Sequence, residues 1–169
     1  MAGKGLVEIF IRPIRPEDAP LLNDLFKSLS SRSVYLRFLS ILKQLPHDML
    51  VRFTQIDYDR QIALVALSGK EPDEKILGVA RVFIEQNKKH GEFSVIAGDS
   101  WQGKGIGAEL LKRCLTIAKE RNMETVWGIV LVENTEMLKL GRKLGFKIKM
   151  IPNSNEYELR IDLRKTDKI

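Results

Sequence analysis

Apolar side chains recur at helical spacing in two long segments of the chain. The first segment follows Pro16-Glu17-Asp18, a triplet that suits the first turn of a helix because proline is tolerated there and acids favour its positive end. Its apolar stripe consists of Leu21, Leu22, Leu25, Phe26 and Leu29. The second segment, from Ile106 to Arg121, is the clearest amphipathic helix of the sequence. Its apolar face consists of Ile106, Leu110, Leu111, Cys114, Leu115 and Ala118.

The first 97 residues also contain the runs of β-branched and aromatic residues that favour strands. The predicted strands are Val7–Ile14, Ile62–Leu67, Ile76–Glu85 and Glu92–Ala97. Short polar turns, Gly69–Asp73 and Asn87–Gly91, join the last three strands, which predicts an antiparallel meander. The region from Ser30 to Ile56 is expected to be helical or irregular, with a helix beginning at Pro46-His47-Asp48.

The C-terminal third alternates strands with one short helix. The predicted elements are a strand Thr125–Val132, a helix Thr135–Leu144, a strand Phe146–Met150, a turn Pro152–Asn155 and a strand Glu156–Leu163. Gly145 is a good stop for the helix. The strand–helix–strand unit around the Gly-rich segment, formed by Glu92–Ala97, Ile106–Arg121 and Thr125–Val132, implies a parallel pair within an otherwise antiparallel sheet. No repeat or Gly/Ser linker divides the chain, so we predict one mixed α/β domain over residues 1–169.

Composition narrows the class of protein. Hydrophobic residues make up 44% and charged residues 30%, which is typical of a soluble globular protein. No apolar run approaches the ~20 residues that span a bilayer, so we expect no membrane association. A formal charge of +6 suits a phosphate-bearing cofactor, and the absence of a dense basic block with aromatics argues against nucleic acid. The lone cysteine is compatible with a cytoplasmic location.

A glycine-rich loop is predicted to join a strand directly to the strong helix. Its sequence is Gln102-Gly103-Lys104-Gly105-Ile106-Gly107. Its glycines let backbone N–H groups approach an anion, and the first turn of the helix adds unpaired N–H groups and positive potential. Lys104 adds a positive charge. A diphosphate is the expected ligand. The spacing fits neither a Walker loop nor a dinucleotide fingerprint, and a tight turn that binds nothing is the alternative.

The glycine loop resembles the acetyl-CoA-binding motif of the GNAT acetyltransferase superfamily, through Gln102-x-x-Gly105-x-Gly107. The superfamily's second marker is similar to Asn134-x-x-Met137-x-x-Leu140-x-x-Lys143-Leu144-Gly145-Phe146. The two markers occur in the expected order and at about the expected distance. The resemblance covers essentially the whole chain and implies a central sheet that is splayed at the acetyl-CoA site and flanked by helices.

The N-terminal half permits a narrower resemblance. The segments Ile11–Asp18 and Ser31–Phe38 are similar to the acetyltransferase domain of bacterial Pat-type protein-lysine acetyltransferases. Many of those proteins carry a synthetase-like or cyclic-nucleotide-binding region as well. Neither region fits within 169 residues, so we expect a stand-alone catalytic module.

Transfer of acetyl from a thioester to a lysine amine needs a base, because the amine is protonated at neutral pH. The resemblance implies that Glu92, ten residues before Gln102, is this base; a solvated surface glutamate is the alternative. It also implies a backbone N–H near Ile96 or Ala97 that polarises the thioester carbonyl. Asn134 is predicted to bind the cofactor or the acceptor region, to cap a helix, or to do both.

One position departs from the family pattern. Alignment on the Gly145-Phe146 marker puts Gly141 where many GNAT enzymes have a tyrosine that protonates the departing thiolate. Gly141 has no side chain, so a tyrosine-acid mechanism is in doubt, although a thiolate leaves readily near neutral pH.

The remaining candidates give weaker predictions. His47 and His90 lack partners at metal-ligand spacing, so we predict no metal site. Cys114 is expected in the core rather than as a nucleophile. Trp101 is expected to pack against the loop or the cofactor, or to have a structural role alone. Three residues, Arg32, Tyr35 and Arg37, lie where GNAT domains build acceptor sites, and stabilisation of a helical lid is the alternative for them.

The leading function is therefore acetyl-CoA-dependent acetylation of the ε-amine of a protein lysine, by direct transfer with a glutamate base. The nearest alternative is acetylation of a small amine, and a third possibility is a catalytically silent acyl-CoA sensor. The protein is expected to be a monomer or a homodimer.

Overall fold

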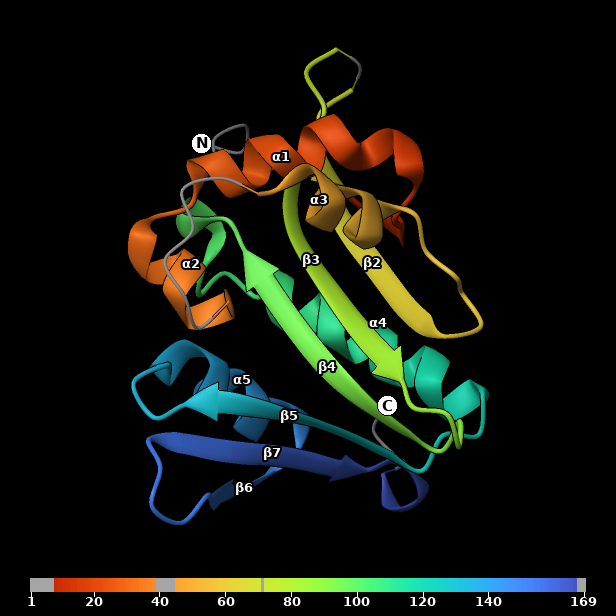
Figure 1. Ribbon diagram of the computed structural model, residues 1–169, viewed down its shortest axis with the longest axis vertical. Coiled ribbons are helices and arrows are strands. Elements are labelled where there is room, and N and C mark those ends of the chain that lie inside the picture. The colour runs from red at the N-terminus through yellow and green to blue at the C-terminus, as the bar shows by residue number, and fades with distance from the viewer. Residues whose placement is uncertain (1–7, 39–44, 71, 167–169) are drawn as a thin grey trace.

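In the computed structural model, which describes residues 8–38, 45–70 and 72–166, seven strands form one sheet in the order β1-β2-β3-β4-β5-β7-β6 (Figure 1). The strands are β1 Ile9–Pro13, β2 Gln61–Ser68, β3 Lys75–Ile84, β4 His90–Ala97, β5 Thr125–Leu131, β6 Lys147–Met150 and β7 Glu156–Asp162. Among these strands only β4 and β5 run parallel; every other neighbouring pair is antiparallel. The predicted mixed α/β sheet with one parallel pair is confirmed.

Helices cover the two faces of the sheet with separate hydrophobic cores. The helices are α1 Ala19–Ser28, α2 Ser31–Phe38, α3 His47–Thr54, α4 Ile106–Glu120 and α5 Thr135–Leu144. One core includes the predicted apolar face of α4, which is buried at all six positions, together with residues of α5 and of the strands. The other core joins α1 and α3 to the opposite face of β2 and β3. Figure 1 shows α4 behind the sheet and α1 and α3 in front of it.

The seven strands and the helices α4 and α5 match the predicted segments, with ends that differ by at most two residues. The helix predicted to open at Pro16 begins with a 3₁₀ turn, Pro16–Asp18, and α1 follows from Ala19. α2 and α3 lie in the region that was expected to be helical or irregular, and α3 begins at His47 as predicted. The predicted positions 7 and 39–44 lie outside the described residues. Two predictions were wrong in detail. A short 3₁₀ turn, η2 Asp99–Trp101, separates β4 from the glycine loop, so the loop does not follow the strand directly. His90 begins β4 rather than lying in the preceding turn, because it pairs with Thr125 of β5.

Within the described ranges, no helix has both the length and the apolar character needed to cross a membrane.

Candidate functional site

The sheet opens between its two parallel strands. β4 and β5 pair over only three residues, His90 to Glu92 opposite Thr125 to Trp127, and beyond these positions the two strands do not pair with each other. β4 stays paired with β3 as far as Ala97, and β5 stays paired with β7 as far as Leu131. The two halves of the sheet therefore diverge after Glu92, and the gap begins where the parallel pairing stops (Figure 1).

Alternate residues of β4 turn their backbone groups toward this gap. The amide of Gly98 donates to the carbonyl of Leu77 at 2.8 Å, so in the β3–β4 register the even-numbered residues of β4 bond with β3. The amide of Ile96 is therefore directed to β3, whereas the backbone groups of Ala97 face the gap. The Ala97 carbonyl accepts a hydrogen bond from Gln102 Nε2 at 3.1 Å on that side. Of the two predicted positions, only Ala97 presents its N–H to the gap.

The glycine loop gives the gap an open edge at the start of α4. Gly103 and Gly105 have φ angles of +74° and +89°, a conformation that other residues rarely adopt. Gly105 precedes the first helical residue, and a Cβ added there would meet no atom within 4 Å. The amides of the first turn of α4 thus lie beside open space. This arrangement fits a bulky anion such as a pyrophosphate, because unpaired N–H groups and the helix dipole converge there.

Gly107 allows a close approach of three elements. A Cβ at Gly107 would lie 3.2 Å from both Val95 Cγ1 on β4 and Leu140 Cδ1 on α5. The absence of this atom lets α4 sit close to β4 and α5 at the bottom of the gap.

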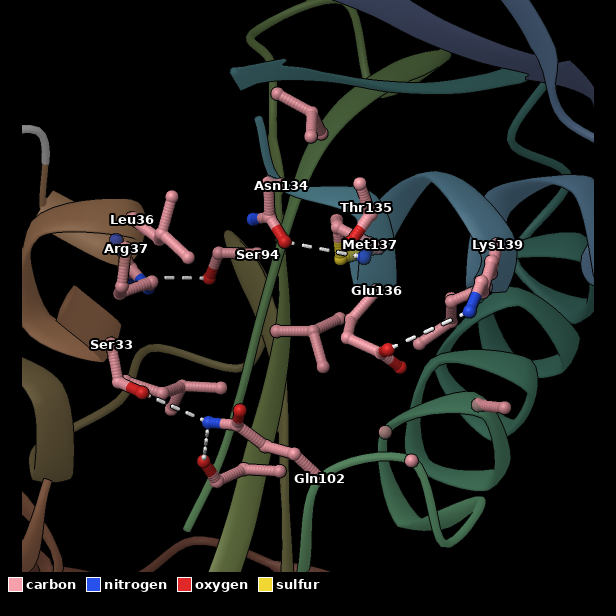
Figure 2. Close-up of a pocket in the computed structure, with 18 of the residues that line it drawn as sticks. Ser33, Leu36, Arg37, Ser94, Gln102, Asn134, Thr135, Glu136, Met137 and Lys139 are labelled. Atoms are coloured by element: carbon pink, nitrogen blue, oxygen red, sulfur yellow. Dashed lines mark hydrogen bonds and ion pairs between the residues drawn. The ribbon is translucent and has the colours of Figure 1, made fainter. Parts of the chain in front are cut away.

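The gap widens into a cavity of about 540 Å³. Its walls come from α2 on one side, from α5 on the other, and from β4 and the glycine loop between them (Figure 2). The sequence-predicted residues that line it are Glu92, Ile96, Ala97, Gln102, Gly103, Gly105, Gly107 and Asn134. Two predicted residues do not line it. Ile106 is buried in the core, and the Nζ of Lys104 lies 5.2 Å from the centre of the Trp101 ring.

Gln102 connects the end of β4 with the start of α2. Its Nε2 donates to the Ser33 hydroxyl at 3.0 Å as well as to Ala97 (Figure 2). The Ser33 hydroxyl in turn donates to Asp99 at 2.8 Å, and the other Asp99 oxygen accepts from the Ser30 amide at 3.1 Å. These bonds fasten the start of α2 to the turn η2. Gln102 therefore shapes the cavity even before any contact with a ligand.

Asn134 caps α5. Its side-chain oxygen accepts a hydrogen bond from the Met137 amide at 3.2 Å, which satisfies one of the unpaired N–H groups of the first turn. The capping interpretation is confirmed. The residue also lines the cavity.

Glu92 is exposed and lies at the last paired position before the sheet opens. Ser94, two residues later, shares its face of the strand because side chains alternate along β4. The Ser94 hydroxyl accepts a hydrogen bond from Arg37 Nη2 at 3.2 Å. Burial lowers the pKa of Arg37, and the nearby Glu92 carboxylate acts in the opposite direction. The face of β4 toward α2 thus combines a carboxylate, a hydroxyl and a guanidinium.

The sequence analysis placed Arg32, Tyr35 and Arg37 near an acceptor site without assigning contacts. Arg37 lines the cavity, and Arg32 Nη2 donates to the Glu133 carbonyl at 3.3 Å across its mouth, while Tyr35 is not part of the lining. Met137, Leu140 and Lys143, three of the cavity-lining residues of α5, were quoted only as a family marker. Their three-residue spacing is that of one helix face, and this pattern would have indicated a wall of the site.

Two further sequence predictions have structural outcomes. Cys114 is fully buried, and burial raises the pKa of its thiol to about 12, so its predicted place in the core is confirmed. Trp101 is half-buried, packs on the core and lines the cavity.

Gly141 is buried, and a Cβ there would point at Leu159 of β7, 2.5 Å from its Cδ2. The space beside Gly141 is therefore filled by the core. Among the described residues, no group of three histidines, cysteines or acids is placed to hold a metal ion.

A splayed sheet with a glycine loop and a helix N-terminus at the opening suits a phosphate-bearing cofactor. The chain matches the model of the acetyltransferase (GNAT) family over residues 31–146, and it belongs to that family. It is 27% identical over 138 residues to the acetyltransferase PA5475 of Pseudomonas aeruginosa, covering 82% of this chain and 74% of that protein.

Solved structures show the same fold. The GNAT domain of S. lividans PAT superposes with a TM-score of 0.81 at 24% identity, covering 90% of this chain and 89% of the other. The resemblance to Pat-type domains thus extends to the fold. The yncA protein of Salmonella typhimurium, a putative acetyltransferase solved with its cofactor acetyl-CoA, gives a TM-score of 0.73 at 16% identity over 94% and 96% of the two chains.

Proposed function

We propose that this GNAT acetyltransferase binds acetyl-CoA between β4 and β5 and transfers its acetyl group directly to the ε-amine of a protein lysine. The observation that carries the cofactor part is the glycine loop, where the first amides of α4 face open space beside Gly105. When bound, acetyl-CoA supplies an activated acetyl thioester. The chain's own residues then have to hold the pyrophosphate, polarise the carbonyl and remove a proton from the amine.

Three parts of the site suit these tasks. The amides of Gly105, Ile106 and Gly107 lie at the positive end of α4 and would bind the pyrophosphate. The Ala97 amide, directed into the gap, would donate to the thioester oxygen. Glu92 lies five residues before Ala97 on the same strand, at the closed end of the gap where the β4–β5 pairing stops, and would accept the amine proton directly or through a water molecule.

Support for a protein acceptor comes from the Pat-type resemblance and from the shape of the site. The cavity opens beside exposed side chains of α2 and β5, including Arg32 and Ile129, which leaves room for a lysine presented by a folded surface. A small amine is the second candidate, since a volume of about 540 Å³ also admits one beside the cofactor's pantetheine arm.

The test of the catalytic assignment is Glu92→Gln, which keeps size and polarity but cannot accept a proton. We expect turnover at neutral pH to fall by ~10²–10⁴-fold, the usual contribution of a positioned base. The fall should shrink as the pH is raised to about 10, because more of the amine then arrives deprotonated. Affinity for acetyl-CoA, measured by calorimetry, should stay near the wild-type value.

Glu120→Gln is the matched control, since Glu120 is an exposed glutamate at the far end of α4. Its rate-versus-pH profile should coincide with that of the wild type. Near-wild-type rates for Glu92→Gln at every pH would assign the base to another group, even if the cofactor site is right.

A further inference from the structure

Arg81 is a buried cation on the face of β3 that α1 and α3 cover. It is only 3% exposed, and its guanidinium carbon lies 4.8 Å from the centre of the Phe53 ring. Its Nη1 atom is buried and has no hydrogen-bond partner within residues 8–38, 45–70 and 72–166. Burial, together with the charge of Arg37, lowers the pKa of Arg81 to about 10, so the group still carries its charge at neutral pH.

A second, smaller chamber of about 30 Å³ lies at this guanidinium. Side chains of α1, α3, β3 and β4 give it mainly apolar walls, and its polar groups come from Arg37, Arg81 and Ser94. Arg37, Ser94 and Ile96 line both this chamber and the large cavity, so the two adjoin. The chamber therefore lies on the same face of β4 as Glu92.

The chemistry of the chamber favours an anion. A buried cation with an unsatisfied N–H costs free energy, and a neighbouring guanidinium of the same sign adds to that cost. An anion between the two would accept the unpaired hydrogen bond and offset the repulsion, and hydrogen bonds between charged groups are the strong ones. The available space admits an ion or group about the size of one or two water molecules, which excludes a phosphate ester or an aromatic acid.

We propose that Arg37 and Arg81 form a binding site for one small monovalent anionic group, a halide ion or a carboxylate, behind the acceptor side of the cleft. This inference does not depend on the identity of the acceptor. Occupancy would neutralise one positive charge beneath Ser94 and so reduce the repulsion that a cationic amine meets as it approaches Glu92.

The test is thermal unfolding of the full chain at constant ionic strength in the sodium salt of HEPES, a bulky sulfonate buffer, with bromide or acetate replacing the sulfonate. We expect a saturable rise in Tm of ~2–4 °C for the wild type, since a ligand that binds the native state stabilises it by mass action. Arg81→Met keeps a long apolar side chain in the chamber and should show no saturable rise. Arg60→Met removes an arginine whose side chain is 81% exposed, and it should retain the full effect.

Two further measurements complete the design. In bromide-soaked crystals of the wild type, an anomalous peak should lie between the guanidinium groups of Arg37 and Arg81. Nα-acetyl-lysine and Nα-acetyl-lysinamide, which lacks the carboxylate, are then compared in halide-free buffer. A rise in Tm with Nα-acetyl-lysine alone would identify the carboxylate of the acceptor as the natural ligand of this site. Equal effects of the two compounds would identify a free anion as the natural ligand. No saturable rise and no bromide peak in the wild type, or an undiminished rise in Arg81→Met, would overturn the proposal.

Discussion

Asp18 accepts two hydrogen bonds from the guanidinium of Arg12, both 2.7 Å long, and a third from the Arg15 amide at 2.8 Å. The carboxylate is only 3% exposed. Both side chains belong to the segment Ile11–Asp18 that resembles Pat-type domains. Their role in this structure is to fasten β1 to the start of the first helical segment. A likeness in sequence at these positions therefore reflects the fold rather than the chemistry of the site.

This ion pair predicts an acid-sensitive stability. Burial acts to raise the pKa of Asp18, but the bonds from Arg12 and Arg15 outweigh it, so the pKa lies below its ordinary value of 3.8. The stabilisation is complete above the unfolded value and is lost as the pH falls through the lower folded value. Asp18→Asn should cost ~3 kcal/mol in urea unfolding at pH 7 and flatten the loss of stability below about pH 4. An unchanged midpoint at pH 7 would show that the pair contributes nothing.

Gly105 tests the cofactor site with an internal control. Gly105→Glu puts a negative side chain where the pyrophosphate is proposed to lie, so acetyl-CoA binding should be abolished, to more than ~100-fold weaker affinity by calorimetry. Gly145 has a similar φ of +91°, and a Cβ there also meets no atom within 4 Å, but it ends α5 away from the cavity. Gly145→Glu should suffer the same backbone strain and keep its affinity. Equal losses in both variants would point to misfolding rather than to the site.

At the scale of whole elements, the periodic parts of the chain were predictable. α4 has six buried apolar positions at 3.6-residue spacing, and the β2–β4 meander has short polar turns, so local pattern was sufficient for both. The contacts that build the site are of another kind. Gln102 binds Ser33 across 69 residues of sequence, and Arg37 binds Ser94 across 57. No local pattern specifies such pairs, because they depend on how α2 lies against β4.

The turn η2 illustrates the same limit. Asp99 accepts bonds from both Ser30 and Ser33, and it thereby holds a short turn between β4 and the glycine loop. From sequence the loop seemed to follow the strand directly. The direction of the Ile96 amide could not be predicted from the sequence either, because it depends on the register of β4 with β3.

The packing of α5 on β7 gives a prediction at this scale. Gly141→Ala would place a methyl group 2.5 Å from Leu159 Cδ2 in a fully buried position. We expect a loss of ~1–3 kcal/mol in denaturant unfolding, the usual cost of overpacking, with acetyl-CoA affinity unchanged. Leu159→Val in the same chain should recover part of the loss through a favourable coupling between the two sites. Strict additivity of the two changes would refute direct contact as the cause.

At the scale of the whole molecule, the two halves of the sheet have different tasks. The half from β1 to β4, with α1–α4, supplies Glu92, the Ala97 amide and the glycine loop. The half from β5 to β6, with α5, supplies the opposite wall through Asn134, Met137 and Leu140. The chemistry is proposed to take place where the halves part, so a single chain can form the whole site.

The most direct test of this account is acetyl transfer from radiolabelled acetyl-CoA, with a folded lysine-bearing protein and a polyamine compared at equal amine concentration. Wild-type chain should label the protein faster than the polyamine, and Gly105→Glu should label neither, because the cofactor is no longer held. Efficient labelling of the polyamine with no labelled protein would contradict the proposed acceptor. Undiminished labelling by Gly105→Glu would contradict the proposed cofactor site itself.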